Sequence, residues 1–337
     1  MYTRPTAEIS AMTRFEITPF IPTGSDRRDV MQLIADSEDF DGYRPLNDQS
    51  WLELSHHTEN GTRISSTGTA WGYLAKDAEN GQLCGYVHIS KTNHGSAIEI
   101  ATSPACRSDY LEIASALARK AIAGLAPAAY PVSLWAIRSN ALLEEVAHSV
   151  SMKAGRELYQ MRRALPLEAE DTQSDPLVLR TFRPGEDELS WLELNNRAFA
   201  GHPEQGNWDL NMLVAREQEP WFDPQGFILC IDANHLAGSC WTKIHPGNFP
   251  ADPPMGEIYV ICVDPAYQGQ GMSAPLLRAG LDYLSSRGLR IAMLYVDSDN
   301  TAALKLYKRF GFKIDHTDRA FSLDEPPGYF RKLRTNR

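Results

Sequence analysis

The residues best suited to chemistry surround a glycine-containing turn late in the chain, Q-G-Q-G-M-S from Gln268 to Ser273. An alternating apolar segment from Glu257 to Val263 precedes it and predicts a strand, and apolar residues at helical spacing follow it to about Ser286. Such a junction directs backbone N–H groups and the positive end of a helix towards an anion. Glycine allows close approach of phosphate oxygens. The turn therefore predicts a site for a phosphorylated cofactor.

Two common nucleotide motifs are missing from this turn. It has neither the G-x-G-x-x-G spacing of a dinucleotide fold nor the G-K-[ST] ending of a P-loop. NAD and nucleoside triphosphates are therefore not favoured.

A carboxylate and a phenol near the turn suit acid–base catalysis. Glu257 enters the strand just before the turn, where it could take a proton from an amine, directly or through water. Tyr307 lies on the helix predicted from Thr301 to Phe310, on the same face as Asn300, and a phenol can protonate a departing thiolate. The alternatives are a solvated glutamate at a strand end and a tyrosine that only packs.

The order of predicted elements occurs twice, which indicates a duplicated mixed α/β fold. We expect a first domain over residues 1–165, a polar linker over 166–176 and a second domain over 177–330. Each domain is predicted to hold a mixed central sheet flanked by helices.

The two halves can be aligned by placing Pro104 on Pro265 and Asn140 on Asn300. The positions that matter for chemistry then differ, with Arg107 for Gln268, Tyr110 for Gly271, Glu112 for Ser273, Ser96 for Glu257 and Ala147 for Tyr307. Tyrosine and glutamate would block or repel a pyrophosphate. The first half is therefore predicted to have a degenerate cofactor turn.

Composition limits the class of partner. The net charge of −10 and the lack of a basic patch argue against nucleic acid. The chain has no apolar run of the roughly 20 residues that span a bilayer and no signal-peptide core, so we expect a cytoplasmic protein without a membrane partner, and a monomer. The cysteines form no C-x-x-C pair, and His202 and His245 read as loop histidines beside proline, so no metal site is predicted.

The turn resembles the pyrophosphate-binding motif R/Q-x-x-G-x-G/A of the GCN5-related N-acetyltransferases, or GNAT family, with Ser273 at the last position. A tandem actinobacterial branch of this family is similar over most of Ala198 to Phe312. The matching strings are A-F-A-G-H-P-E-Q-G, W-F-D-P-Q-G-F, L-A-G-S-C-W-T-K-I-H-P, G-E-I-Y-V-I-C-V-D-P-A, L-Y-V-D-S-D-N and Y-x-x-x-G-F. The first half matches through fragments such as D-G-Y-R-P-L-N-D-Q.

The resemblance implies acetyl-CoA as cosubstrate, with Glu257 as base and Tyr307 as acid. It implies cofactor contacts from Ile261, Cys262, Val263, Gln268, Gly269, Gln270, Gly271, Met272, Ser273, Ala274, Asn300 and Lys305. It also implies that a cysteinyl-glucosamine-inositol acceptor, acetylated on its cysteine amine to form mycothiol, contacts Asp48, Glu204, Lys243, Glu257 and Tyr295.

Two other functions remain open at this stage. The chain could be a GNAT enzyme for another small amine, such as an antibiotic or polyamine, or for a protein N-terminus. It could instead be a non-catalytic acetyl-CoA sensor. Glu257 and Tyr307 argue against the sensor, and the H-P-E-Q-G and W-T-K-I-H-P strings argue against the other acceptors.

Overall fold

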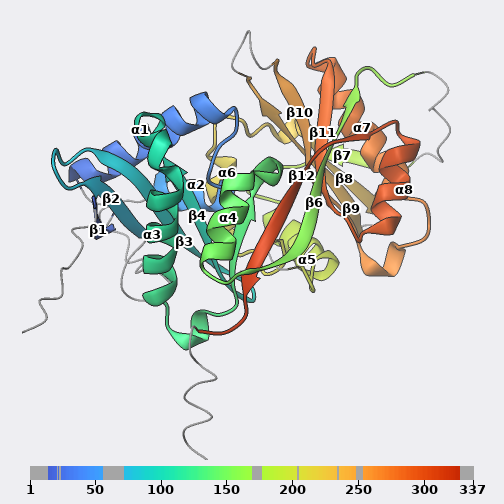
Figure 1. Cartoon of the computed structure of the whole chain (residues 1–337). Helices are drawn as coiled ribbons and strands as arrows, with labels where there is room; N and C mark the ends of the chain where they lie inside the picture. Colours follow the sequence, from blue (N-terminus) through green and yellow to red (C-terminus); the bar gives the residue numbers. More distant parts are fainter. Residues whose placement is uncertain are drawn as a thin grey trace, which may run out of the picture.

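The computed structural model describes residues 14–20, 22, 24–55, 72–168, 177–202, 205–233, 235–247 and 253–326. Within these ranges the fold is mixed α/β, as the sequence predicts, with helices on both faces of a central sheet (Figure 1).

The described residues of the first half form six strands and four α-helices, with short 3₁₀ turns between some of them. Its elements are β1 (Phe15–Phe20), α1 (Gly24–Asp41), α2 (Asp48–Ser55), β2 (Gly72–Asp77), β3 (Leu83–Thr92), β4 (Gly95–Thr102), η1 (Pro104–Asp109), α3 (Tyr110–Ala123), η2 (Pro127–Ala129), β5 (Val132–Ala136), η3 (Ile137–Ser139), α4 (Ala141–Ser149) and β6 (Lys153–Ala164). Helix α2, which begins at the predicted acceptor residue Asp48, was not predicted from the sequence.

The second half repeats this order. Its elements are β7 (Val178–Thr181), α5 (Glu188–Ala198), α6 (Leu210–Glu217), η5 (Pro224–Gly226), β8 (Phe227–Asp232), β9 (His235–His245), β10 (Met255–Val263), η6 (Pro265–Tyr267), α7 (Ser273–Ser286), β11 (Ile291–Asp297), α8 (Thr301–Arg309) and β12 (Lys313–Leu323). Helix α8 ends before Gly311, whose φ of +78° suits a glycine C-cap.

The twelve strands found in the described ranges form one sheet, in the order β1-β2-β3-β4-β5-β12-β6-β11-β10-β9-β8-β7. Strand β6 therefore lies between β11 and β12, and β12 pairs with both β5 and β6. The last strand of each half therefore pairs with a strand of the other half, β6 with β11 and β12 with β5. The boundary predicted at 166–176 remains a proposal, and residues 169–176 of it lie outside the described ranges.

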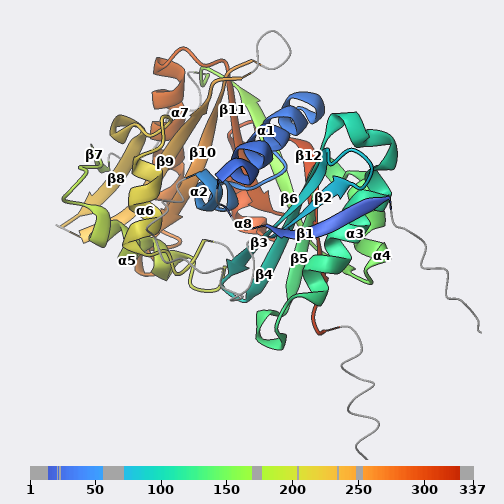
Figure 2. The same ribbon diagram turned by 90° about the vertical axis from the view of Figure 1, so that its left-hand side faces the viewer.

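Each half buries a core on both sides of its part of the sheet. On one side α3 and α4 pack in the first half and α7 and α8 in the second, and the second cluster includes Leu276, Leu281 and Tyr307. On the other side lie α1, α2, α5 and α6, where Trp191 and Trp241 belong to an aromatic cluster. Figure 2 shows α2 between α1 and α6. Helix α2 thus brings the first half against the second.

A β-bulge distinguishes the two halves. The register between β9 and β10 shifts between Ile258 and Val260, whereas β3 and β4 pair without a shift. In the parallel ladders, Glu257 pairs with Met293, and the matching pair is Ala97 with Ser133. The first-half counterpart of Glu257 is therefore Ala97, so the alignment with Ser96 was wrong by one residue. A single alignment offset cannot accommodate the extra residue of a bulge.

Candidate active site

Glu257 is buried and hydrogen-bonded, not a solvated glutamate at a strand end. Only 8% of the residue is exposed. Its Oε2 lies 2.7 Å from Nε2 of His245 at the end of β9. The interpretation of His245 as a loop histidine was therefore wrong, because the residue closes a strand and contacts the predicted base.

Lys243 joins the two halves beside Glu257. Its Nζ donates to Oδ2 of Asp48 on α2 at 2.5 Å, and lies 4.8 Å from the ring centre of Trp221 and 5.3 Å from that of Tyr259. Burial alone would raise the pKa of Asp48, but Lys243, together with Arg216 and His245, outweighs burial and the pKa is lowered overall. Aromatic faces and a carboxylate thus stabilise a buried ammonium.

Tyr295 lies on β11 on the same side of the sheet as Glu257, and 40% of it is exposed. Its hydroxyl accepts a hydrogen bond from Nε2 of Gln160 on β6 at 2.7 Å. Burial of the phenol and the Glu257 carboxylate raise the pKa of Tyr295. The structure therefore brings four predicted acceptor residues together: Asp48, Lys243, Glu257 and Tyr295. Glu204 lies outside the described residues.

Tyr307 lies on the opposite side of the sheet, in the core cluster beneath α7 and α8. The residue is 6% exposed, and its ring centre is 5.9 Å from that of Phe312. Burial, and secondarily Cys240, raises the pKa of Tyr307. The phenol therefore keeps its proton at neutral pH, as a general acid requires.

The sheet opens between two neighbouring strands, β10 and β11, close to Glu257. Strands β10 and β11 pair only at Gly256 and Glu257, opposite Ala292 and Met293. The rest of β10, including the predicted cofactor residues Ile261, Cys262 and Val263, continues its ladder with β9 alone. Backbone groups on its β11 side can therefore bond a pantetheine arm.

The glycine turn lies between η6 and α7. Gly269 and Gly271 have φ of +78° and +81°, a region that strains other residues. The side-chain Nε2 of Gln270 donates to the Ala266 carbonyl at 3.2 Å. Met272 is the N-cap of α7, and Ser273 and Ala274 form its first turn. Sequence reasoning missed Asp264, which accepts from the Ala266 N–H and pairs with Arg197 at 2.8 Å. Its position before Pro265 is typical of such a cap.

The two remaining predicted cofactor residues lie on α8. Asn300 is the N-cap, and its Oδ1 accepts from the Ala303 N–H at 3.1 Å. Lys305 is exposed one turn further on. The helix thus starts just after the end of β11.

The corresponding turn of the first half is filled by its own side chains. The Arg107 guanidinium lies 5.2 Å from the ring centre of Phe40 and 4.9 Å from that of Tyr110. It donates to Thr102 Oγ1 at 2.8 Å and pairs with Asp41. An arginine held in this way is engaged internally, so this turn lacks the open backbone of the second half.

Comparisons with known proteins identify the family of the chain. Residues 189–312 match the Acetyltransferase (GNAT) family. A mycothiol acetyltransferase of Acidimicrobium ferrooxidans is 41% identical over 86% of this chain and 91% of its own length. The chain belongs to the mycothiol acetyltransferase family. A second family member, from Thermobispora bispora, is 40% identical over 86% of this chain and 93% of its own.

Solved structures show the same fold at lower identity. A GCN5-related N-acetyltransferase of Sphaerobacter thermophilus has a TM-score of 0.63 and 21% identity, covering 93% of this chain and 96% of its own. A tandem GNAT protein of the clavulanic acid pathway has a TM-score of 0.58 and 13% identity, covering 92% and 98%. These structures confirm the expected GNAT fold. The family itself indicates an acetyl-CoA-dependent N-acetyltransferase.

Sequence reasoning missed a polar connection between the halves. Arg216 on α6 donates to the Tyr259 hydroxyl at 2.9 Å and to Gln49 Oε1 on α2 at 3.1 Å. Tyr259 is the residue in the bulge of β10. The sequence gives no signal for these contacts, because helix α2 itself was not predicted.

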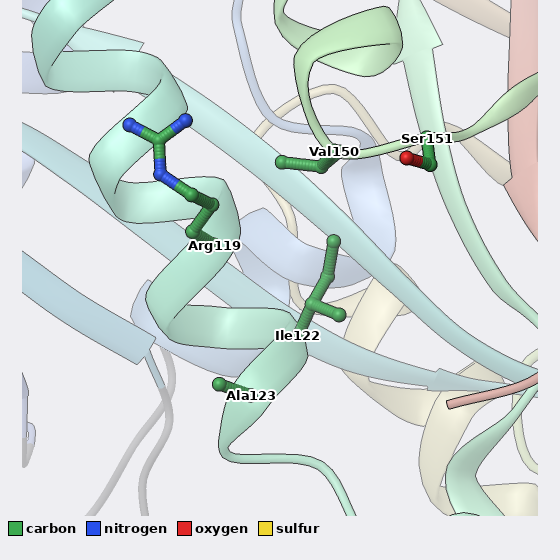
Figure 3. Close-up of a pocket in the computed structure, with 5 residues that line it drawn as sticks. All are labelled: Arg119, Ile122, Ala123, Val150 and Ser151. Atoms are coloured by element: carbon green, nitrogen blue, oxygen red, sulfur yellow. The ribbon is translucent and has the colours of Figure 1, made fainter. Parts of the chain in front are cut away.

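One pocket of the described chain lies apart from this site. A small pocket of the first half is lined by Arg119, Ile122 and Ala123 of α3 and by Val150 and Ser151 (Figure 3). It lies on the α3 and α4 side of the sheet, away from Glu257. Among the described residues, no group of three or more His, Cys, Asp or Glu side chains could hold a metal, and no described helix is long and apolar enough to cross a membrane.

Proposed function

We propose that this chain transfers the acetyl group of acetyl-CoA to the cysteine amine of a cysteinyl-glucosamine-inositol acceptor, forming mycothiol. The observation that carries the proposal is that Glu257 and Tyr307 lie on opposite faces of the sheet, in the region where β10 and β11 stop pairing. A thioester lying across this opening would meet a base on one side and an acid on the other.

The reaction follows from these positions. The acceptor reacts as the neutral amine, which attacks the thioester carbonyl carbon while Glu257 takes the proton that its nitrogen loses. Backbone N–H groups of Ile261 to Val263 stabilise the tetrahedral oxyanion. The C–S bond then breaks, and Tyr307 protonates the leaving thiolate. The amide and free coenzyme A are the products.

The acceptor site combines groups from both halves. Asp48, Lys243 and Tyr295 offer a carboxylate, an ammonium and a phenol beside Glu257. These groups suit the many hydroxyls of a sugar–inositol conjugate. The relatives' name supports this acceptor. The second half would bind acetyl-CoA through Gln268 to Ala274, Asn300 and Lys305, while the first half shapes the acceptor site.

We also propose that the enzyme acts as a monomer in the cytoplasm and without a metal. The acceptor and acetyl-CoA are both small molecules, and the five cysteines are free and buried. Each half supplies groups to one site within a single chain, which supports a monomeric enzyme.

The test offers the purified chain acetyl-CoA with the cysteinyl pseudodisaccharide, a polyamine or a peptide with a free N-terminus. Loss of the thioester and the product mass are followed, because the acceptor carries its own thiol. We expect acetylation of the pseudodisaccharide at a kcat/KM at least about 100-fold above that of the other amines. Preference for a polyamine or peptide would support the alternative acetyltransferase, and binding without turnover would support the sensor.

The base is tested by Glu257→Gln, which should lower kcat about 100- to 10,000-fold, the usual size of a general-base contribution. The matched control is Glu145→Gln on the exposed surface of α4, which should retain wild-type turnover. Full activity of Glu257→Gln would remove Glu257 from the mechanism.

A further inference from the structure

We propose that His245 is a positioning residue that orients Glu257 as the catalytic base. The inference rests on the proposed function, since it concerns how the assigned base is held. His245 is the last residue of β9, and its ring is the group in direct contact with the carboxylate of Glu257.

The register of the strands makes this contact informative. Directly opposite Glu257 on β9 stands Lys243, while His245 stands opposite Met255. Cross-strand partners are the closest side chains on one face of a sheet. A carboxylate at this position would therefore be expected to pair with the lysine.

The lysine is instead drawn towards the first half. Its Nζ donates to Asp48 at 2.5 Å and lies over the rings of Trp221 and Tyr259. A permanent cation bonded to Glu257 would stabilise its charged form and weaken it as a base. The pairing with Asp48 therefore leaves Glu257 to the imidazole.

The contact with His245 fixes one carboxylate oxygen. An ionised carboxylate only accepts hydrogen bonds, so Nε2 of His245 carries the hydrogen and donates to Oε2 at 2.7 Å. Oε1 is then the oxygen that takes the proton from the acceptor. The side chain of Glu257 is 10% exposed and that of His245 is 31% exposed. The imidazole therefore contacts the buried carboxylate from the side nearer to solvent. A base held in one rotamer loses less orientation on reaching the transition state.

The experiment is a double-mutant cycle with His245→Phe and Glu257→Gln. His245→Phe removes the donor and keeps a ring, and should lower kcat about 10- to 50-fold with little change in the KM for acetyl-CoA. His245→Gln restores an N–H donor and should recover most of that loss. In the Glu257→Gln background, His245→Phe should cost less than about 2-fold, because it acts only through the base.

Three outcomes separate the claims. Wild-type kcat in His245→Phe, or losses that multiply in the double variant, would overturn the positioning role while leaving the proposed function intact. Full activity of Glu257→Gln alone would overturn the assigned base itself. His148→Phe, an exposed histidine of α4 whose ring contacts Phe321, is the matched control and should behave as wild type.

Discussion

The glycine turn of the second half and its counterpart in the first occupy the same place in the fold but differ in what fills them. Gly269 and Gly271 leave the backbone open, since nothing lies within 4 Å of a Cβ built on either residue. In the first half Arg107 and Tyr110 fill the space with a stacked cation and ring. Duplication has therefore given one half that can hold a cofactor and one that packs the same position with side chains.

The two halves also differ on the other face of the sheet, which α1, α2, α5 and α6 cover. The bulge-corrected register places Trp241 and Val260 of the second half where the first half has His88 and Glu99. Trp241 belongs to an aromatic core, whereas buried His88 contacts Tyr86 at 2.7 Å and Glu53 of α2 at 3.3 Å. The polar interior of the first half thus supports α2, the helix that delivers Asp48 to the second half.

The largest expected effect is the loss of coenzyme A binding when Gly271 of the second half is replaced by tyrosine, the residue at the matching position of the first half. Calorimetry of the wild type should show one coenzyme A site per chain, and Gly271→Tyr should remove it. The tyrosine blocks the phosphates, and a side chain at φ of +81° costs about 1–2 kcal/mol. Gly288→Tyr is the matched control, because its φ is also +81° and its Cβ space is also open. Two equal wild-type sites, or one site left in Gly271→Tyr, would break the comparison.

The second effect concerns the acid, whose counterpart in the first half is Ala147. Tyr307→Phe should lower kcat about 100-fold without changing the melting temperature, because the ring still packs. Burial raises the pKa of Tyr307, so the phenol keeps its proton and kcat of the wild type should not fall through this group below about pH 10. Tyr130→Phe in the first half, whose hydroxyl donates to Ile122, is the control. Equal kcat for both variants would leave the reaction without its assigned acid.

The smallest effect sharpens the role of α2. Asp48→Asn leaves the Lys243 ammonium buried without its carboxylate and should lower the free energy of unfolding by about 2 kcal/mol at pH 7. The pKa of Asp48 is lowered in the folded chain, so its stabilisation is present above about pH 4 and is lost as the pH falls through the folded value. Urea unfolding at several pH values should show the free energies of unfolding of Asp48→Asn and the wild type becoming equal as the pH falls. Exposed Asp29→Asn on α1 should show no difference at any pH.

The sequence was sufficient for the features that depend on local pattern. Alternation and helical spacing predicted nearly all strands and helices, and the turn before Ser273 lies between a strand and a helix as expected. Asn300 and Gly311 lie at the two ends of α8, where capping residues belong. These signals lie within a few residues of the structure they specify.

Features that depend on distant partners were not predictable. Helix α2 buries Ser50, Leu52 and Leu54, whose two-residue spacing does not indicate a helix. The bulge at Tyr259 exists only relative to β9, and the contact of His245 with Glu257 depends on Lys243 being taken by Asp48 from the first half. The residue pattern of a single segment does not predict which of several distant residues a side chain will contact.

The central placement of β6 and β12 constrains how this protein can be divided. A fragment ending near residue 168 would lack the final strand that covers β5, and a fragment starting near residue 177 would lack the one that covers β11. Each piece would present an unpaired edge, the usual template for aggregation. The repeat is therefore interlocked, since each copy depends on the closing strand of the other to cover the edge of its part of the sheet.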